Sequence, residues 1–148
     1  MTGREITDVA PEGAAALAGI LGDWVRETGW MPVLHGRDED LGFLTGLIGH
    51  QVCRVVRGSA GPLGFLARQK GHIDALYLAP GARGKGIGTA LLAEVKAREP
   101  MVELWTFQAN TRAIAFYLRE GFHEIERTDG RRNDEGLPDL RLIWRSEI

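Results

Sequence analysis

The sequence predicts an α+β fold: one domain built on a mixed, mainly antiparallel sheet with helices on both faces. A length of 148 residues suits a single domain, taken here as residues 1–148. Short apolar runs typical of strands alternate with stretches whose apolar residues recur at helical spacing. Glycine-rich turns join strands in the middle of the chain. The predicted order is β-α-α-β-β-β-α-β-α-β-β, with no internal repeat.

The first third of the chain is predicted to hold one strand and two helices. A weak strand pattern surrounds Ile6. Pro11 suits the first turn of a helix that Gly29 ends, and residues 30–36 form a loop. The acidic run at residues 38–40 favours the start of a second helix. That helix is expected to bury an apolar stripe of Leu41, Leu44, Leu47 and Ile48.

The rest of the chain is predicted to alternate strands with two further helices. The strand ending before Pro80 is short and apolar, which suits a largely buried position. A helix with a regular apolar stripe starts at Ile87, and another follows Asn110 and ends near Gly121. The expected strands are residues 51–56, 63–67, 72–78, 102–107, 123–127 and 140–144.

Composition narrows the class of protein. All apolar runs are far shorter than the ~20 residues of a membrane helix. Residues 1–5 lack an apolar signal core, so a cytoplasmic protein without membrane contact is expected. A net charge of −2 and a pI near 6.1 argue against nucleic acid as a partner.

Cysteine and histidine give little support to metal or thiol chemistry. The single Cys53 cannot form an intrachain disulfide and is expected to be a small buried hydrophobe rather than a nucleophile. The four histidines show no spacing typical of metal ligands. No metal is therefore expected.

The turn from Pro80 to Thr89 has the composition of an anion cradle. Glycines let the backbone approach a ligand closely, and the positive end of the following helix favours a phosphate. Two well-known phosphate loops fail on spacing. A Walker loop needs Ser or Thr after Lys85, where Gly86 stands, and no G-x-G-x-x-G pattern is present.

Two motifs in this sequence resemble those of the GNAT superfamily of acyl-CoA-dependent N-acyltransferases. Arg83-x-x-Gly86-x-Gly88 is similar to the pyrophosphate-binding signature of that family. The segment from Asn110 to Phe122, with Ala113, Phe116, Tyr117 and Gly121, looks like the second signature. Structural readings also exist: Asn110 as a helix cap, Gly121 as a terminator and Tyr117 as a core ring. The resemblance covers about the last two-thirds of the chain.

The resemblance implies an enzyme, an acetyl-CoA-dependent N-acetyltransferase. The expected reaction transfers an acetyl group from acetyl-CoA, the co-substrate, to a primary amine of a small molecule or protein by direct attack in a ternary complex. The alternative is a non-catalytic acyl-CoA-binding or regulatory module on the same fold. The acceptor amine is not given by the sequence, and a homodimer is left open.

The resemblance also assigns roles to residues. The pantetheine arm would lie along Leu76 and Leu78, and a backbone N–H near Tyr77 would polarise the thioester carbonyl. Asn110 would clamp the arm, and Tyr117 would protonate the leaving thiolate. The pyrophosphate would bind the loop of Arg83, Gly84, Lys85, Gly86, Ile87, Gly88 and Thr89, chiefly through backbone amides.

The general base is the least defined part of the expected site. His72 and Asp74 lie two apart on one strand, so their side chains share a face. Some relatives carry a carboxylate at about the position of His72, and a histidine titrates near neutrality. Asp74 could act through a water or orient the amine, and both residues could be mere surface polar groups. Acceptor recognition is expected from Trp24, Trp30, Met31, His35 and the acidic run 38–40, which would favour a cationic amine.

Overall fold

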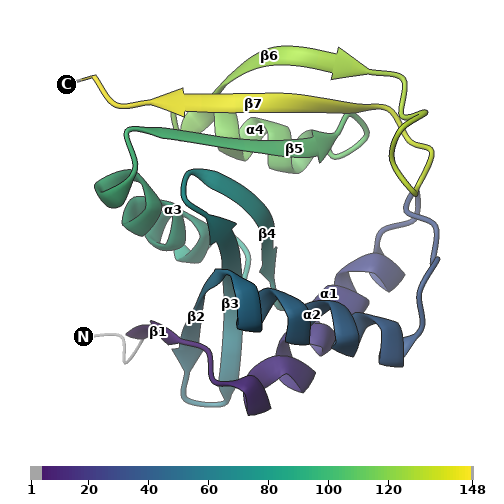
Figure 1. Ribbon diagram of the computed structural model, residues 1–148, viewed down its shortest axis with the longest axis vertical. Helices are drawn as coiled ribbons and strands as arrows, with labels where there is room; N and C mark the ends of the chain where they lie inside the picture. Colours follow the sequence, from purple (N-terminus) through teal and green to yellow (C-terminus); the bar gives the residue numbers. More distant parts are fainter. Residues whose placement is uncertain (1–4, 148) are drawn as a thin grey trace.

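Residues 5–147, the part that the computed structural model describes, form a seven-stranded sheet, four α-helices and one 3-10 turn (Figure 1). The strands are β1 (Glu5–Asp8), β2 (Val52–Gly58), β3 (Gly61–Gln69), β4 (His72–Leu78), β5 (Met101–Phe107), β6 (His123–Thr128) and β7 (Asp139–Arg145). The helices are η1 (Pro11–Gly13), α1 (Ala14–Glu27), α2 (Arg37–His50), α3 (Ile87–Arg98) and α4 (Thr111–Arg119). The predicted order of elements is confirmed.

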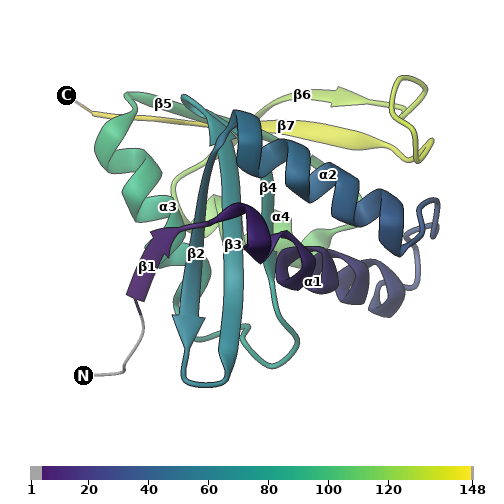
Figure 2. The same ribbon diagram turned by 60° about the horizontal axis from the view of Figure 1, so that its bottom comes forward.

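The sheet has the order β1-β2-β3-β4-β5-β7-β6, and its neighbours are antiparallel except for β4 and β5. Helices cover both faces, as predicted, and each face has its own core (Figure 2). One core joins α3 and α4 to the sheet around Leu91, Leu92 and Leu142, which are at most 1% exposed. The other joins α1 and α2 around Leu17, Leu44 and Phe65. No helix within residues 5–147 is long and apolar enough to cross a membrane.

Two details of the sequence prediction are wrong. Leu41 is 40% exposed, whereas Leu44 and Leu47 are buried as expected. The core under α1 and α2 takes up Leu44 and Leu47 but does not extend to Leu41. The strand at residues 72–78 is only partly buried. This strand, β4, pairs with β5 at one end only, so the rest of its edge on that side is uncovered.

β4 and β5 meet at one end and then separate. Of the described residues, His72 and Glu103 are the only register pair between the two strands. Beside them the Glu103 N–H donates to the Gly71 carbonyl at 2.8 Å. A Cβ at Gly71 would overlap the Met101 carbonyl oxygen, so this close approach requires glycine. The parallel strands therefore form a V whose closed end is this junction.

A β-bulge lies next to the junction. Ala75 stands opposite Ala67 and Ile73 opposite Arg68, which leaves Asp74 without a partner in β3. In a regular strand Ile73 and Ala75 would face the same side. Here Ile73 joins the core under α3, while Ala75 joins the core under α1 and α2. The bulge therefore brings the Asp74 side chain to the point where the strands diverge.

Gly71→Ala is expected to lower the free energy of unfolding by about 1–3 kcal/mol, the range found for overpacked sites. The added methyl group meets main-chain atoms of β5, which cannot rotate away as a side chain could. Gly46→Ala is the matched control, because a Cβ there has no atom within 4 Å. In the middle of α2 this change is expected to stabilise by up to about 1 kcal/mol. Urea unfolding of both variants measures the difference, and equal stability of Gly71→Ala and the wild type would contradict the tight junction.

Candidate active site

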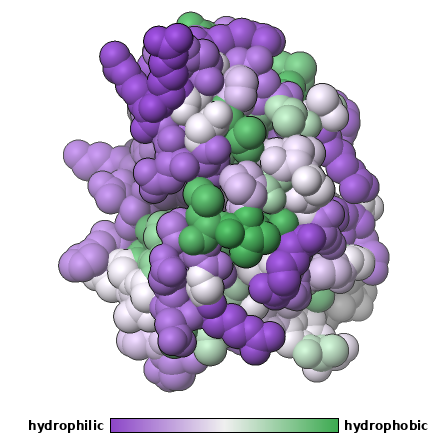
Figure 3. Space-filling model, turned by 90° about the vertical axis from the view of Figure 1, so that its right-hand side faces the viewer, coloured by the Kyte–Doolittle hydropathy of each residue, from purple (hydrophilic) through white to green (hydrophobic). Residues whose placement is uncertain are grey.

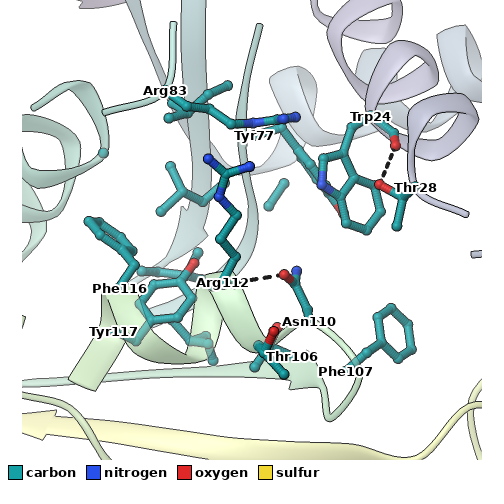
Figure 4. A pocket seen from close by; sticks show the side chains of 18 of the residues that line it. Trp24, Thr28, Tyr77, Arg83, Thr106, Phe107, Asn110, Arg112, Phe116 and Tyr117 are labelled. Carbon is teal, nitrogen blue, oxygen red and sulfur yellow. Dashed lines mark hydrogen bonds between the residues drawn. The ribbon is translucent and has the colours of Figure 1, made fainter. Parts of the chain in front are cut away.

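The diverging strands open into the main cleft of the described chain, a cavity of about 840 Å³ (Figure 4). Its walls are β4, β5, the start of α4, the end of α1 and the turn that leads into α3. Most of the residues singled out from the sequence meet there. Leu76, Tyr77, Leu78, Asn110 and Tyr117 all line the cleft, as do Asp74 and residues 83, 84 and 86–89.

The cleft exposes unpaired main-chain groups of β4. The Ala79 N–H donates to the Leu63 carbonyl at 2.8 Å, which fixes the alternation along the antiparallel β3–β4 ladder. Tyr77 therefore turns its N–H and C=O toward β3. Leu76 and Leu78 turn theirs into the cleft, where no strand of residues 5–147 pairs with them. These two residues can accept an extended ligand as an additional strand would be accepted.

The turn before α3 forms a cradle of backbone N–H groups. Gly84 and Gly86 have φ of 75° and 79°, a left-handed conformation that favours glycine. Gly86 is the N-cap of α3 and offers no side chain to cap it, and Ala90 is the first residue to bond back to Gly86. The N–H groups of Ile87, Gly88 and Thr89 consequently lack partners within the helix. Such a terminus is a ready anion site.

Gly88 differs from the other glycines of this turn. It is buried and lacks a positive φ, and a Cβ there would lie 2.9 Å from Cζ of Phe116. The missing side chain thus makes room for a ring of α4. Ile87 likewise buries its side chain in the core and has only its main chain available for a ligand.

Arg83 does not stand free in the loop. Its guanidinium bonds the carboxylate of Glu27 in the last turn of α1, on the opposite wall of the cleft. A carboxylate at a helix C-terminus interacts unfavourably with the helix dipole, so a cationic partner stabilises that end of the helix. Lys85 is not among the residues that line the cleft.

Tyr117 and Asn110 come from the two ends of α4. The Tyr117 ring is 7% exposed and packs on Phe116 and Phe122, with ring centroids 5.2 and 5.4 Å apart. Its hydroxyl has no hydrogen-bond partner within residues 5–147 and points into the cleft (Figure 4). Burial raises the pKa of Tyr117, so the hydroxyl keeps its proton at neutral pH. The Asn110 side chain accepts the Ala113 N–H at 3.2 Å, which confirms it as the helix cap.

His72 and Asp74 are in contact, as their shared strand face predicted. His72 Nε2 lies 3.2 Å from Asp74 Oδ1, and His72 Nδ1 lies 3.0 Å from Glu103 Oε1. Asp74 lines the cleft, whereas His72 stands behind it. Glu103 was not singled out from the sequence, because its position opposite His72 depends on the register of the two parallel strands.

Aromatic rings wall the far side of the cleft. Trp24 packs on Tyr77 with centroids 5.2 Å apart and on Trp30 at 6.0 Å, and Trp30 packs on Phe107 at 5.8 Å. Sequence reasoning expected acceptor contacts from both tryptophans. It missed Phe107, which the divergence of β5 brings opposite Trp30.

Other residues expected at the acceptor side lie outside the cleft. Met31 is buried, and His35 bonds Glu39 at 2.8 Å, an interaction that raises the pKa of His35. On this side of the molecule, apolar surface gathers among charged groups (Figure 3). The α1–α2 loop contributes the exposed Val33 and Leu34.

Arg112 also points into the cleft, from the first turn of α4 (Figure 4). It forms no ion pair with any residue of the described chain. A cation at a helix N-terminus is disfavoured by the helix dipole. This position could have been noticed in the sequence, because Arg112 stands two residues after the Asn110 cap.

Within residues 5–147 there is no group of three or more His, Cys, Asp or Glu side chains that could hold a metal ion. Cys53 is buried as expected, and this burial raises the pKa of its thiol to about 11.

Comparison with known proteins relates this geometry to acetyl transfer. Residues 11–122 match the model of the acetyltransferase (GNAT) family. The peptidyl-lysine N-acetyltransferase YiaC of Escherichia coli is 40% identical over 83 residues, which cover 55% of this chain and 56% of that protein. The chain thus spans a little over half the length of this curated relative.

Solved structures share the fold across nearly all of this chain. The solution structure of apo YjaB from Escherichia coli has a TM-score of 0.77 at 22% identity and covers 95% of this chain and 97% of its own. The structure of yncA from Salmonella typhimurium, solved with acetyl-CoA, has a TM-score of 0.74 at 15% identity and covers 96% and 93%. Because both sequence identities are below 25%, these likenesses show a shared fold and nothing more.

Proposed function

This chain belongs to the GNAT family of acetyltransferases, and we propose that it transfers an acetyl group from acetyl-CoA to a primary amine by direct attack in a ternary complex. The observation that carries the proposal is the V between β4 and β5. It presents unpaired main-chain groups, an anion cradle and a tyrosine hydroxyl in one cleft. A protein that only bound acyl-CoA would have no need for the proton donor.

Acetyl-CoA is proposed to bind this cleft in an extended pose. The pyrophosphate would lie on the N–H groups at the start of α3, near Arg83. The pantetheine arm would run along β4 and form hydrogen bonds with the main chain of Leu76 and Leu78. On its way it would pass Asn110, which lines the cleft at the start of α4. Its acetyl end would then approach the bulge at Asp74. The Tyr77 N–H is turned toward β3, so the N–H proposed to polarise the thioester carbonyl is the neighbouring one of Leu76, which faces the cleft.

The chemistry requires the acceptor nitrogen to lose two protons and the leaving sulfur to gain one. An acceptor ammonium must lose a proton before its nitrogen can attack the thioester carbon, and Asp74 with His72 stands at the closed end of the V to receive it. The carbon–sulfur bond then breaks, and the thiolate takes a proton from the Tyr117 hydroxyl. The attacking nitrogen gives up its second proton, which leaves a neutral amide and can restore the Tyr117 hydroxyl. Burial keeps this hydroxyl protonated until it is used.

The acceptor is proposed to enter past the tryptophans of α1 and the following loop. Rings of Trp30 and Phe107 can flank an aliphatic chain that ends in the amine. The name of the relative YiaC, a peptidyl-lysine N-acetyltransferase, favours a lysine side chain of a protein over other primary amines. A cytoplasmic location, where such acceptors are abundant, stays a prediction.

A panel of amines tests the function. The protein is incubated with acetyl-CoA and, in turn, lysine peptides, polyamines, amino sugars and α-amino peptides, and free thiol release is measured. Turnover above the rate of spontaneous hydrolysis with any amine is the expected result. Tight CoA binding without turnover on any amine would favour the regulatory alternative.

Glu27→Gln is expected to raise the affinity for CoA by up to about fivefold. The change removes the negative charge that pairs with Arg83, and an ion pair whose side chains are about one-third exposed is worth about 0.2–1 kcal/mol. Asp23→Asn is the matched control, because Asp23 lies on the same helix but pairs with Arg26 away from the cleft. Calorimetric titration with CoA measures both variants. Weaker binding in Glu27→Gln would mean that the pair organises the cradle rather than competing with the ligand.

A further inference from the structure

Four ionisable side chains form a continuous chain at the closed end of the V. His72 Nδ1 is hydrogen-bonded to Glu103 Oε1 at 3.0 Å, and His72 Nε2 lies 3.2 Å from Asp74 Oδ1. The other oxygen of Glu103 accepts from Arg141 of β7, whose Nε lies 3.1 Å away. Asp74 is the member that lines the cleft, and the other three stand behind it. The chain therefore connects the cleft to a fixed cation inside the sheet.

Glu103 is suited to hold one nitrogen of the His72 ring. The Arg141 guanidinium, and after it the His72 ring, holds the pKa of Glu103 below its usual value, so Glu103 is a carboxylate at neutral pH. A carboxylate can only accept hydrogen bonds. It therefore selects the ring form that carries a hydrogen on Nδ1. Nε2 is then the ring atom that can take up a proton on the side of Asp74.

The positions of both partners are fixed by the backbone. Glu103 stands opposite His72 in the register of β4 and β5, and its N–H is bonded to Gly71. Asp74 is held from the other side by Gln51, whose Nε2 donates to Oδ2 at 2.6 Å. The His72 ring consequently sits between two anchored carboxylates.

We propose that Glu103 is a positioning residue for removal of the acceptor's proton, an inference that rests on the function proposed above. The ammonium N–H bond breaks, and its electron pair stays on nitrogen for attack on the thioester carbon. The proton passes by way of Asp74 to Nε2 of His72. The resulting imidazolium donates to Asp74 and Glu103 together, and Arg141 keeps Glu103 in place throughout.

The first test is the pH profile of kcat/KM for the wild type and Glu103→Gln. Glutamine keeps the size of the side chain, and its Oε1 can still accept from Nδ1, but the negative charge beside the ring is lost. The charged groups that face His72 are Asp74 and Glu103 directly, with Arg141 and Glu126 behind them. Loss of one close opposite charge disfavours the protonated ring, so the acid limb should move to lower pH.

Glu126→Gln is the matched control. Glu126 lies on β6, is half exposed and contacts the same Arg141 at 3.7 Å, but it does not touch His72. Its profile should coincide with that of the wild type. An unmoved acid limb in an active Glu103→Gln enzyme would overturn the proposal, as would an equal shift in both variants.

A second readout needs no turnover. Nitrogen-15 NMR of the unliganded protein should show the neutral His72 ring with its hydrogen on Nδ1 in the wild type and a mixture of the two ring forms in Glu103→Gln. A wild-type ring with its hydrogen on Nε2 would overturn the role of Glu103 even in an active enzyme. Lack of turnover with every amine, beside the expected NMR result, would contradict the proposed function instead.

Discussion

Tyr117→Phe is expected to lower kcat by about a hundredfold, the usual size of the loss of a general acid. The hydroxyl is the one group removed, and it makes no hydrogen bond within the described chain. The ring keeps its packing against Phe116 and Phe122. The midpoint of thermal unfolding should therefore match that of the wild type. The affinity for CoA, measured by calorimetry, should stay within a few fold of the wild-type value.

Tyr77→Phe is the comparison for this variant. Tyr77 also lines the cleft, and burial raises the pKa of its hydroxyl to about 12, so it is the competing proton donor. It comes from β4 and packs between Trp24 and Phe65. We expect turnover to fall far less here than in Tyr117→Phe. A larger loss of turnover in Tyr77→Phe than in Tyr117→Phe would make Tyr77 the proton donor. Wild-type turnover in Tyr117→Phe would mean that Tyr117 only packs in the core.

The fold could be predicted from the sequence because its elements carry local signals. The periodic stripe of Ile87, Leu91 and Val95 is buried as the spacing required, and Asn110 caps α4 as an asparagine at that position should. Errors arose where burial depends on a distant element. Leu41 fits the period of its helix, yet the core under α1 and α2 does not extend to it, which no local pattern reveals.

The candidate site was predictable only where one segment supplies it. The turn at residues 83–89 and the segment after Asn110 are continuous motifs, so their residues could be named in advance. Glu103 and Arg141 enter the site through the pairing of β4, β5 and β7, which sequence alone does not fix. The pairing of Arg83 with Glu27 joins residues 56 apart and was missed for the same reason.

Gly86→Asp is expected to weaken CoA binding by at least about a hundredfold. A carboxylate at the start of α3 would face the pyrophosphate, and like charges about 4 Å apart repel by about 4 kcal/mol at an effective dielectric of 20. The position is exposed, and a Cβ there meets no atom within 4 Å. Gly88→Asp would be a poorer test, because its side chain would strike Phe116 and disturb the helix packing.

Strain and charge must be separated at this position, since φ is 79° at Gly86. Asparagine and aspartate adopt such a conformation at a similar cost, about 1–2 kcal/mol at most. Gly86→Asn therefore carries the same size and strain without the charge, and it should lose only a small part of the affinity. Calorimetric titration with CoA and with pantetheine, which lacks the phosphates, distinguishes the outcomes. Binding of pantetheine should survive in both variants. Equal loss of CoA binding in both would assign the effect to backbone geometry, and unchanged binding in both would move the phosphate site away from the start of α3.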